Sequence, residues 1–283
     1  MNRMILTASW LLLLANTAIA NTVMAGERVE QSKTWTETFP VTAGSPTLNI
    51  ENIWGDVRVR PGKTGEIVVT ISERRSAPDQ KRFDRSLETL KLNTEADDNG
   101  VAFYVGTEDR EWHGRNRCRN CRVDYQFDVV VPVDTQLDVS TVNDGRIDVA
   151  DVAGSVSAAN VNGPISVSGM HGCEELNSVN GEVEAGFATP PGDSCRIETI
   201  NGDITLALPE NSDFDLAMDL FNGRLVTQLP VDPLALPATV EHTEHNGRNQ
   251  YKIAQQAGVR IGAGGPLFTI SSINGDIRIQ KTN

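Results

Sequence analysis

Residues 145–185 read GRIDVADVA GSVSAANVN GPISVSGMH GCEELNSVN GEVEA, and this stretch decides the fold. A glycine opens each block, nine residues after the previous one. Apolar residues recur at the same period in three stripes, which are interrupted only by Glu174: Ile147, Val156, Ile165, Val183; Val149, Ala158, Val167, Leu176, Ala185; and Val152, Val161, Met170, Val179. A fixed period of this kind predicts stacked repeats whose neighbours together bury one continuous core.

Alternate blocks differ, so we expect a repeat unit of 18 residues with two short strands and two corners. Asparagine precedes glycine in every second block and in three later copies: Asn162-Gly163, Asn180-Gly181, Asn201-Gly202, Asn222-Gly223 and Asn274-Gly275. Asn and Gly both tolerate a positive φ, so we expect each Asn-Gly to turn the chain sharply. A following Ile-x-Ile or Val-x-Val points two side chains to one face of a strand.

Two stackings of these units are open. Successive units form either parallel coils of a solenoid or antiparallel hairpins of a meander. Asn-Gly alone favours hairpins. The constant register of the stripes favours coils, because a coil places equivalent residues directly above one another. We therefore predict an all-β fold whose main part, 133–283, is a β-solenoid-like repeat domain with Asn-Gly corners.

A smaller β-rich region, 26–132, is predicted to precede the repeats. Alternating apolar residues indicate half-buried strands at 48–50, 57–59, 101–105 and 123–131. One short amphipathic helix is expected over 79–92, because Phe83, Leu87 and Leu90 are spaced i, i+4 and i+7 among charged residues.

The first 25 residues are predicted to be a signal peptide. Arg3 precedes an apolar run from Ile5 to Leu14, and small residues follow at Ala18-Ile19-Ala20 and Val23-Met24-Ala25. The run is too short to span a bilayer, which takes about 20 apolar residues. We therefore expect an exported protein, periplasmic or on the cell surface, that does not span the membrane. The formal net charge of −13 disfavours unspecific binding to nucleic acid.

The four cysteines are expected to form disulfides, because the predicted compartment is oxidising. One coil after Cys173, at the 21-residue step from Gly181 to Gly202, falls one residue short of Cys195. Neighbouring strands lie about 4.8 Å apart, within the Cα separation that a disulfide requires. We predict a Cys173–Cys195 bridge and, by elimination, a Cys118–Cys121 bridge.

Three segments resemble a known family. Asp124–Pro132, Leu137–Val139 with the Asn-Gly repeats after it, and the closing Phe268–Ile279 are similar to the DUF4097 family, described as "putative adhesin". The resemblance implies a β-solenoid-like repeat domain in an exported or envelope protein. It brings no catalytic residues to carry over, and fold does not imply function.

No motif indicates an enzyme, a metal site or a cofactor. Nine-residue calcium repeats need Gly-Gly-x-Gly-x-Asp, and none of the quoted units contains that motif. Asp203 and Asp276 follow Asn-Gly and are interpreted as exposed turn carboxylates rather than the paired acids of a glycosidase. His242 and His245 lie beside Glu241 and Glu244, but a metal site needs a third ligand and a rigid frame. We interpret them as residues of a solvated loop, because this stretch lies in an irregular segment.

An arginine-rich segment is the exception in this acidic chain. Between Arg110 and Arg122 it carries Arg115, Arg117 and Arg119, and such clusters recognise carboxylates or phosphates. An anionic glycan or envelope protein is therefore a candidate partner. We expect a non-enzymatic adhesin-like or scaffolding protein of the envelope. The alternatives are a β-helix enzyme acting on polysaccharide and an accessory protein in envelope stress signalling; the sequence leaves the oligomeric state open.

Overall fold

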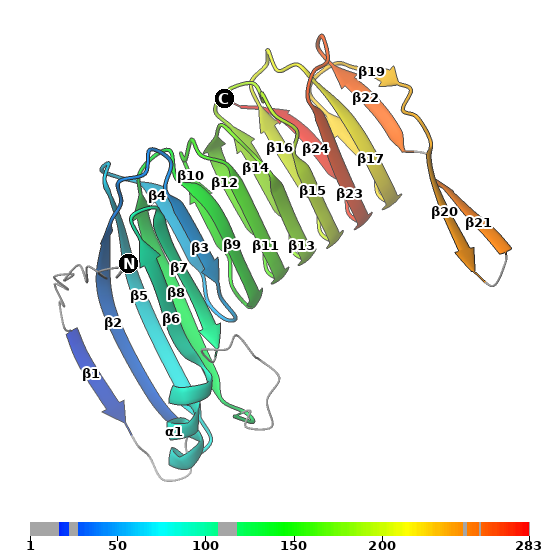
Figure 1. Cartoon of the computed structure of the whole chain (residues 1–283). Coiled ribbons are helices and arrows are strands. Elements are labelled where there is room, and N and C mark those ends of the chain that lie inside the picture. The colour runs from blue at the N-terminus through cyan, green and yellow to red at the C-terminus, as the bar shows by residue number, and fades with distance from the viewer. Residues whose placement is uncertain (1–16, 23–27, 107–117, 246–247, 255, 283) are drawn as a thin grey trace, which may run out of the picture.

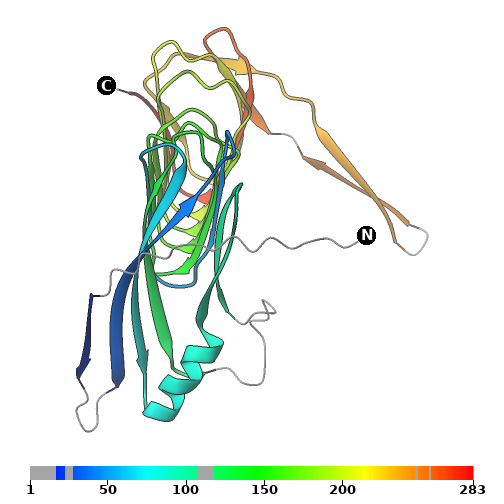
Figure 2. The same ribbon diagram turned by 60° about the vertical axis from the view of Figure 1, so that its left-hand side comes forward.

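The structure, a computed structural model, describes residues 17–22, 28–106, 118–245, 248–254 and 256–282. Within these ranges the chain is nearly all β, with a single helix. Two large sheets, here named A and B, face each other along the molecule, and a two-stranded hairpin projects from one end (Figure 1, Figure 2). The apolar core fills the space between the two sheets.

Sheet A contains eleven strands. In spatial order they are β1 (Thr17–Thr22), β2 (Val29–Pro40), β5 (Glu66–Ala77), β8 (Arg122–Val131), β4 (Val57–Pro61), β10 (Ile147–Ala150), β12 (Ile165–Met170), β14 (Val183–Phe187), β16 (Ile204–Leu208), β24 (Ile277–Lys281) and β18 (Leu225–Thr227). The pairing is antiparallel from β1 to β8 and parallel from β8 to β18.

Sheet B also contains eleven strands. Their order is β19 (Val231–Leu234), β22 (Ala257–Ile261), β17 (Phe214–Asn222), β23 (Leu267–Asn274), β15 (Arg196–Asn201), β13 (Glu175–Asn180), β11 (Val156–Asn162), β9 (Gln136–Asn143), β3 (Thr47–Glu51), β7 (Gly100–Gly106) and β6 (Lys91–Asp97). All pairings from β17 to β7 are parallel, and those at the two ends are antiparallel.

Repeat units stack as rungs, a rung being one strand of sheet B followed by one of sheet A. Asn162 of β11 pairs with Asn180 of β13, and Asn180 pairs with Asn201 of β15. Ile147, Ile165, Val183 and Ile204 are aligned in the same way in sheet A. This pairing is parallel, so the antiparallel meander is not formed by these units. The same sheets continue into the N-terminal region, where β3 pairs with β9.

The spatial order of the rungs differs from their order in the sequence. The C-terminal rung, β23 and β24, lies between the rung of β15 and β16 and the rung of β17 and β18. Its Ile277 pairs with Ile204 on one side and with Leu225 on the other. Figure 1 shows these red strands between yellow-green and yellow ones. Residues near the chain end therefore belong to the interior of the stack.

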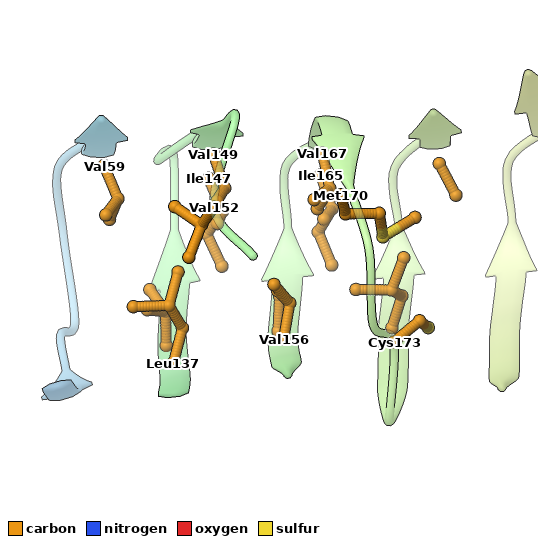
Figure 3. Packing of buried hydrophobic residues seen from close by; sticks show 14 of the residues in the cluster. Val59, Leu137, Ile147, Val149, Val152, Val156, Ile165, Val167, Met170 and Cys173 are labelled. Atoms are coloured by element: carbon orange, nitrogen blue, oxygen red, sulfur yellow. The ribbon is translucent and has the colours of Figure 1, made fainter. Parts of the chain in front are cut away.

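The first two apolar stripes point between the sheets, as Figure 3 shows for Ile147, Ile165 and Val167. The third stripe is predicted to be buried, but not all of its residues are. Val152 and Met170 are buried, whereas Val161 is 37% exposed. Side chains alternate along a strand, and Val156 and Ala158 already point inward, so Val161 must point outward.

The Asn-Gly turns do not use the positive φ that the sequence predicts. Among described residues of the repeat corners, positive φ occurs at Asp144, which is inserted between Asn143 and Gly145, and at the opposite corner, at Asp151 and at Gly169, 18 residues later. Glycine is needed after asparagine for another reason. A Cβ on Gly202 would lie 2.1 Å from the carbonyl oxygen of Gly181 in the preceding rung. The rungs approach too closely there for any side chain.

A buried arginine connects the N-terminal strands with the helix α1 (Gln80–Thr89). Arg75 of β5 donates to Glu73 at 2.7 Å, to the Leu90 carbonyl oxygen at 2.9 Å and to the Tyr125 hydroxyl at 2.9 Å. Burial raises the pKa of Tyr125, so this hydroxyl stays protonated. The helix is shorter than the predicted 79–92, and Leu87, expected on its buried face, is 45% exposed.

Residues between the last rungs form strands where a loop was expected. His242 lies in β20 (Thr239–His245), which pairs with β21 (Arg248–Ala254) in the projecting hairpin. In the part of the chain that the structure describes, no helix has the length and apolarity to cross a bilayer.

Candidate functional site: the outer face of sheet B

A ladder of asparagine side chains runs along the outside of the turns. In each step the amide nitrogen of one asparagine donates to the side-chain oxygen of the asparagine on the neighbouring rung, at 2.7–3.3 Å. The ladder contains, in spatial order, Asn143, Asn162, Asn180, Asn201, Asn274 and Asn222. The ladder crosses six rungs. The asparagine before each turn glycine therefore holds neighbouring rungs together, in addition to its role in the turn.

A second polar row lies two residues before these asparagines and points inward. Thr199 donates its hydroxyl to the carbonyl oxygen of Gly181, and Ser178 does the same for Gly163. The full row is Thr141, Asn160, Ser178, Thr199 and Ser272, each bonded to a turn glycine on the preceding rung. Buried carbonyl groups are costly without such partners. The repeat signature is therefore polar, Val or Ile, Asn, Gly.

An exposed apolar row is formed by the residues that stand, in the sequence, between the inward polar residue and the ladder asparagine of each rung. It contains one apolar residue on each rung, of which Val179 is half-buried and the others are exposed: Val142, Val161, Val179, Ile200, Ile273 and Phe221. Ile200 and Ile273 are 42% and 44% exposed, and Phe221 at the end of the row is 78% exposed. Single exposed apolar residues are ordinary, but a contiguous row marks an interaction surface.

A shallow groove follows this row across five strands of sheet B, with a volume of about 520 Å³. Beside the apolar row its floor carries small or polar side chains: Ser140, Ala159, Asn177, Glu198 and Ser271. A second hollow, lined by Tyr104 and Val105, shares Ser140 and Val142 with it. We call this continuous surface the outer groove. Of the described residues, Glu198 is the one carboxylate that lines its five-strand part.

The outer groove was not recognised from the sequence, although a signal was present. Val161 and Val179 keep the nine-residue period, which placed them with the core stripes. Strand parity gives the opposite answer, because each lies an odd number of residues from the inward residues of its strand. The alternation of side chains within a strand, rather than the nine-residue period between strands, therefore decides which face a residue points to.

The turn carboxylates considered for catalysis are engaged in structure. Asp203 Oδ1 accepts from the backbone N–H of Asp276 on the next rung at 2.8 Å, and its other oxygen binds Arg278. Hydrogen bonding from Arg278 lowers the pKa of Asp203. A carboxylate held ionised in this way is unsuited to act as a general acid. Since its pKa is lowered on folding, its small stabilising contribution is lost as the pH falls through that pKa.

The predicted anion-binding arginines are only partly described. Arg115 and Arg117 lie outside the described residues. Arg119 is exposed in the turn between Cys118 and Cys121. The neighbouring Arg122 is bound to Asp124 at 2.7 Å and to Asp144 at 3.3 Å, so acidic residues of the fold already neutralise part of this segment.

The four cysteines form two disulfides, Cys118–Cys121 and Cys173–Cys195. The Cα atoms of Cys173 and Cys195 are 5.3 Å apart. The bridge joins adjacent rungs, because Arg196 N–H donates to the carbonyl oxygen of Glu174. Such bonds fit a chain that folds in an oxidising environment. Within the described residues no group of histidine, cysteine and acidic side chains is arranged to hold a metal ion.

Removing the second bridge should destabilise the protein. We expect Cys173→Ala with Cys195→Ala to lower the free energy of unfolding by about 3 kcal/mol, from the loop-closure entropy of a bridge that spans 22 residues. Cys118→Ala with Cys121→Ala is the matched control and should cost less, since its bridge spans three residues. Urea unfolding of both variants measures the difference. Non-reducing peptide mapping that recovers Cys173 and Cys195 in separate peptides would contradict the pairing.

Comparison with known proteins gives remote structural alignments and no match by sequence. No family model matches the chain, and no curated protein matches it by sequence. The crystal structure of a putative cell adhesion protein from Clostridium sporogenes aligns with 88% of this chain and 100% of its own, at 12% identity and a TM-score of 0.42. That of a putative adhesin from Bacteroides fragilis aligns with 88% of this chain and 97% of its own, at 12% identity and a TM-score of 0.36.

Proposed function

We propose that this chain is a β-solenoid of the DUF4097 type with Asn-Gly corners, and that it binds a partner through the outer groove. It is exported, works in the periplasm or on the cell surface, and is adhesin-like or scaffolding rather than enzymatic. The predicted division into a leader at 1–25, a β-rich region at 26–132 and a repeat domain at 133–283 is part of this proposal.

The outer groove carries the proposal. Its long, open surface is lined by Val and Ile beside Ser, Asn and Ala, with few charges. A polysaccharide-cleaving enzyme needs a pair of carboxylates about 5 to 9 Å apart across its substrate. The five-strand part of the groove carries one, Glu198. A surface of this composition supports binding of an extended partner.

Capture from envelope extracts tests the groove. Val161→Thr with Ile200→Thr removes apolar surface while keeping β-branched side chains suited to strands. We expect this variant to lose most of the capture that the unchanged protein shows. Val130→Thr with Val226→Thr is the matched control, because these residues are 40% and 46% exposed on sheet A. The control should capture normally.

Equal capture by both variants would remove the groove from the proposal. Release of new reducing ends from envelope polysaccharide by the purified protein would contradict the non-enzymatic reading. An anionic glycan or envelope protein held by Arg115, Arg117 and Arg119 is a separate proposal. For that surface, changing the three arginines to serine should weaken capture of the partner while leaving the unfolding temperature nearly unchanged.

A further inference from the structure

Strand β2 lies near the free end of sheet A. It pairs with β5 along its whole length, from Val29 to Pro40. Among the described residues, its other side pairs with β1 alone, antiparallel and over residues 30–34. Figure 2 shows β1 and β2 at the rim of the molecule. This side of β2 therefore accepts an extended antiparallel chain.

The strand on that side belongs to the predicted leader. Residues 17–22 lie within the segment 1–25 that export is expected to remove. Once it is gone, a strand of twelve residues presents an unpaired edge. A long edge of this kind is a template for pairing with another chain.

The inward-facing side chains of β2 are self-complementary. Lys33, Trp35 and Glu37 follow one another on the face that looks toward the core. The Lys33 ammonium lies 4.7 Å from the centre of the Trp35 ring, and Trp35 donates its indole N–H to Glu37 at 2.7 Å. Lys33 also contacts Glu73 at 2.8 Å, and its side chain is half exposed. The lysine and the glutamate are thus held on either side of the tryptophan.

We propose that the processed protein dimerises by antiparallel pairing of β2 with β2 of a second copy, centred on Trp35. In this register Lys33 faces Glu37 of the partner subunit, and the two-fold axis repeats the pair. Opposite charges directly across an antiparallel pair are stabilising. A register centred on Lys33 would place lysine against lysine, and one centred on Glu37 would place glutamate against glutamate. The charge pattern therefore selects one register and one partner. The inference rests on removal of the leader and not on the proposed groove.

The test uses protein exported and processed by the cell, its N-terminus read by mass spectrometry. Light scattering after gel filtration should give a dimer for the unchanged chain. Glu37→Lys keeps the Lys33–Glu73 contact and places like charges across both pairs. We expect its dimer dissociation constant to rise at least about tenfold, because two attractive pairs become repulsive. Glu88→Lys, on the exposed face of α1, makes the same change in net charge and should leave the dimer intact.

A mixing experiment tests the register. In Lys33→Glu, positions 33 and 37 are both glutamate, so this variant should be monomeric alone. Mixed with Glu37→Lys, in which both positions are lysine, it should form a heterodimer, since every facing pair then has opposite charges. Thermal unfolding checks that Lys33→Glu is folded beside Glu73; if it is not, Glu37→Lys against Glu88→Lys remains decisive. The proposal is overturned if the processed chain is monomeric at micromolar concentration, if it retains residues 17–22, or if Glu37→Lys dimerises as well as the unchanged chain.

Discussion

Gly202→Ala should lower the free energy of unfolding by about 3 kcal/mol, at the upper end of what an added methyl group costs in a packed interior. The new Cβ would lie 2.1 Å from the Gly181 carbonyl oxygen and 2.6 Å from its carbon. Both atoms are backbone, so no side chain can move aside. Relief requires the rungs to separate, which strains the hydrogen bonds from the N–H groups of Gly181 and Gly202 to the next rungs, both 3.0 Å long.

Gly172→Ala is the matched control for this variant. Gly172 also opens a nine-residue block, but the nearest atom to a Cβ there is 3.6 Å away, an ordinary contact. Its φ lies outside the left-handed range, so alanine is expected to be neutral or slightly stabilising. Urea unfolding of the two variants gives the comparison. Similar losses in both would show that the rung spacing is not what demands glycine at position 202.

Val167→Asp should be the most damaging single change in the repeats, with a loss of at least ~4 kcal/mol or no folded protein. Val167 is 1% exposed and lies between Val149 and Ala185 in the register of sheet A. A carboxylate there would enter an apolar stack with no partner. Circular dichroism during thermal unfolding measures the effect.

The control for Val167→Asp is one residue away. Ser166 points to the outside of sheet A, where it is aligned with Asp148 on one side and Glu184 on the other. Ser166→Lys places a positive charge between two carboxylates and should change the stability by no more than about 0.5 kcal/mol. Equal destabilisation by the two variants would contradict the assignment of Val167 to the inner face.

Much of the architecture follows from local sequence. Period and register placed Ile147, Ile165 and Val183 in one buried line, because equivalent residues of stacked rungs must lie above one another. The same arithmetic brought Cys173 close to Cys195, which the structure joins in a disulfide. The helix start was equally readable, since Asp79 caps α1 by accepting from the backbone N–H of Arg82.

The glycine after each asparagine shows where local reasoning fails. Turn propensity explains Asn-Gly by backbone conformation within one chain segment. The structure explains it by contact with the neighbouring rung, which only the tertiary fold supplies. The asparagine ladder and the inward polar row have the same origin. Each of these residues hydrogen-bonds to a partner 15 or more positions away in the sequence, and a propensity scale does not include that partner.

By itself the sequence determined that the chain is a stack of short β-strands, which residues of the first two stripes are buried, and which cysteines come within reach. Only the tertiary structure decided where the last rung goes. In the sequence, residues 267–281 come after residues 214–227, and nothing in that order predicts that the later segment is inserted before the earlier one in the stack. In the structure, β23 lies between β15 and β17. All rungs share one hydrogen-bonding pattern and one inner face, so several orders satisfy the local rules. The choice among them depends on side-chain packing across the whole stack, as where Phe268 lies between Phe187 and Phe214.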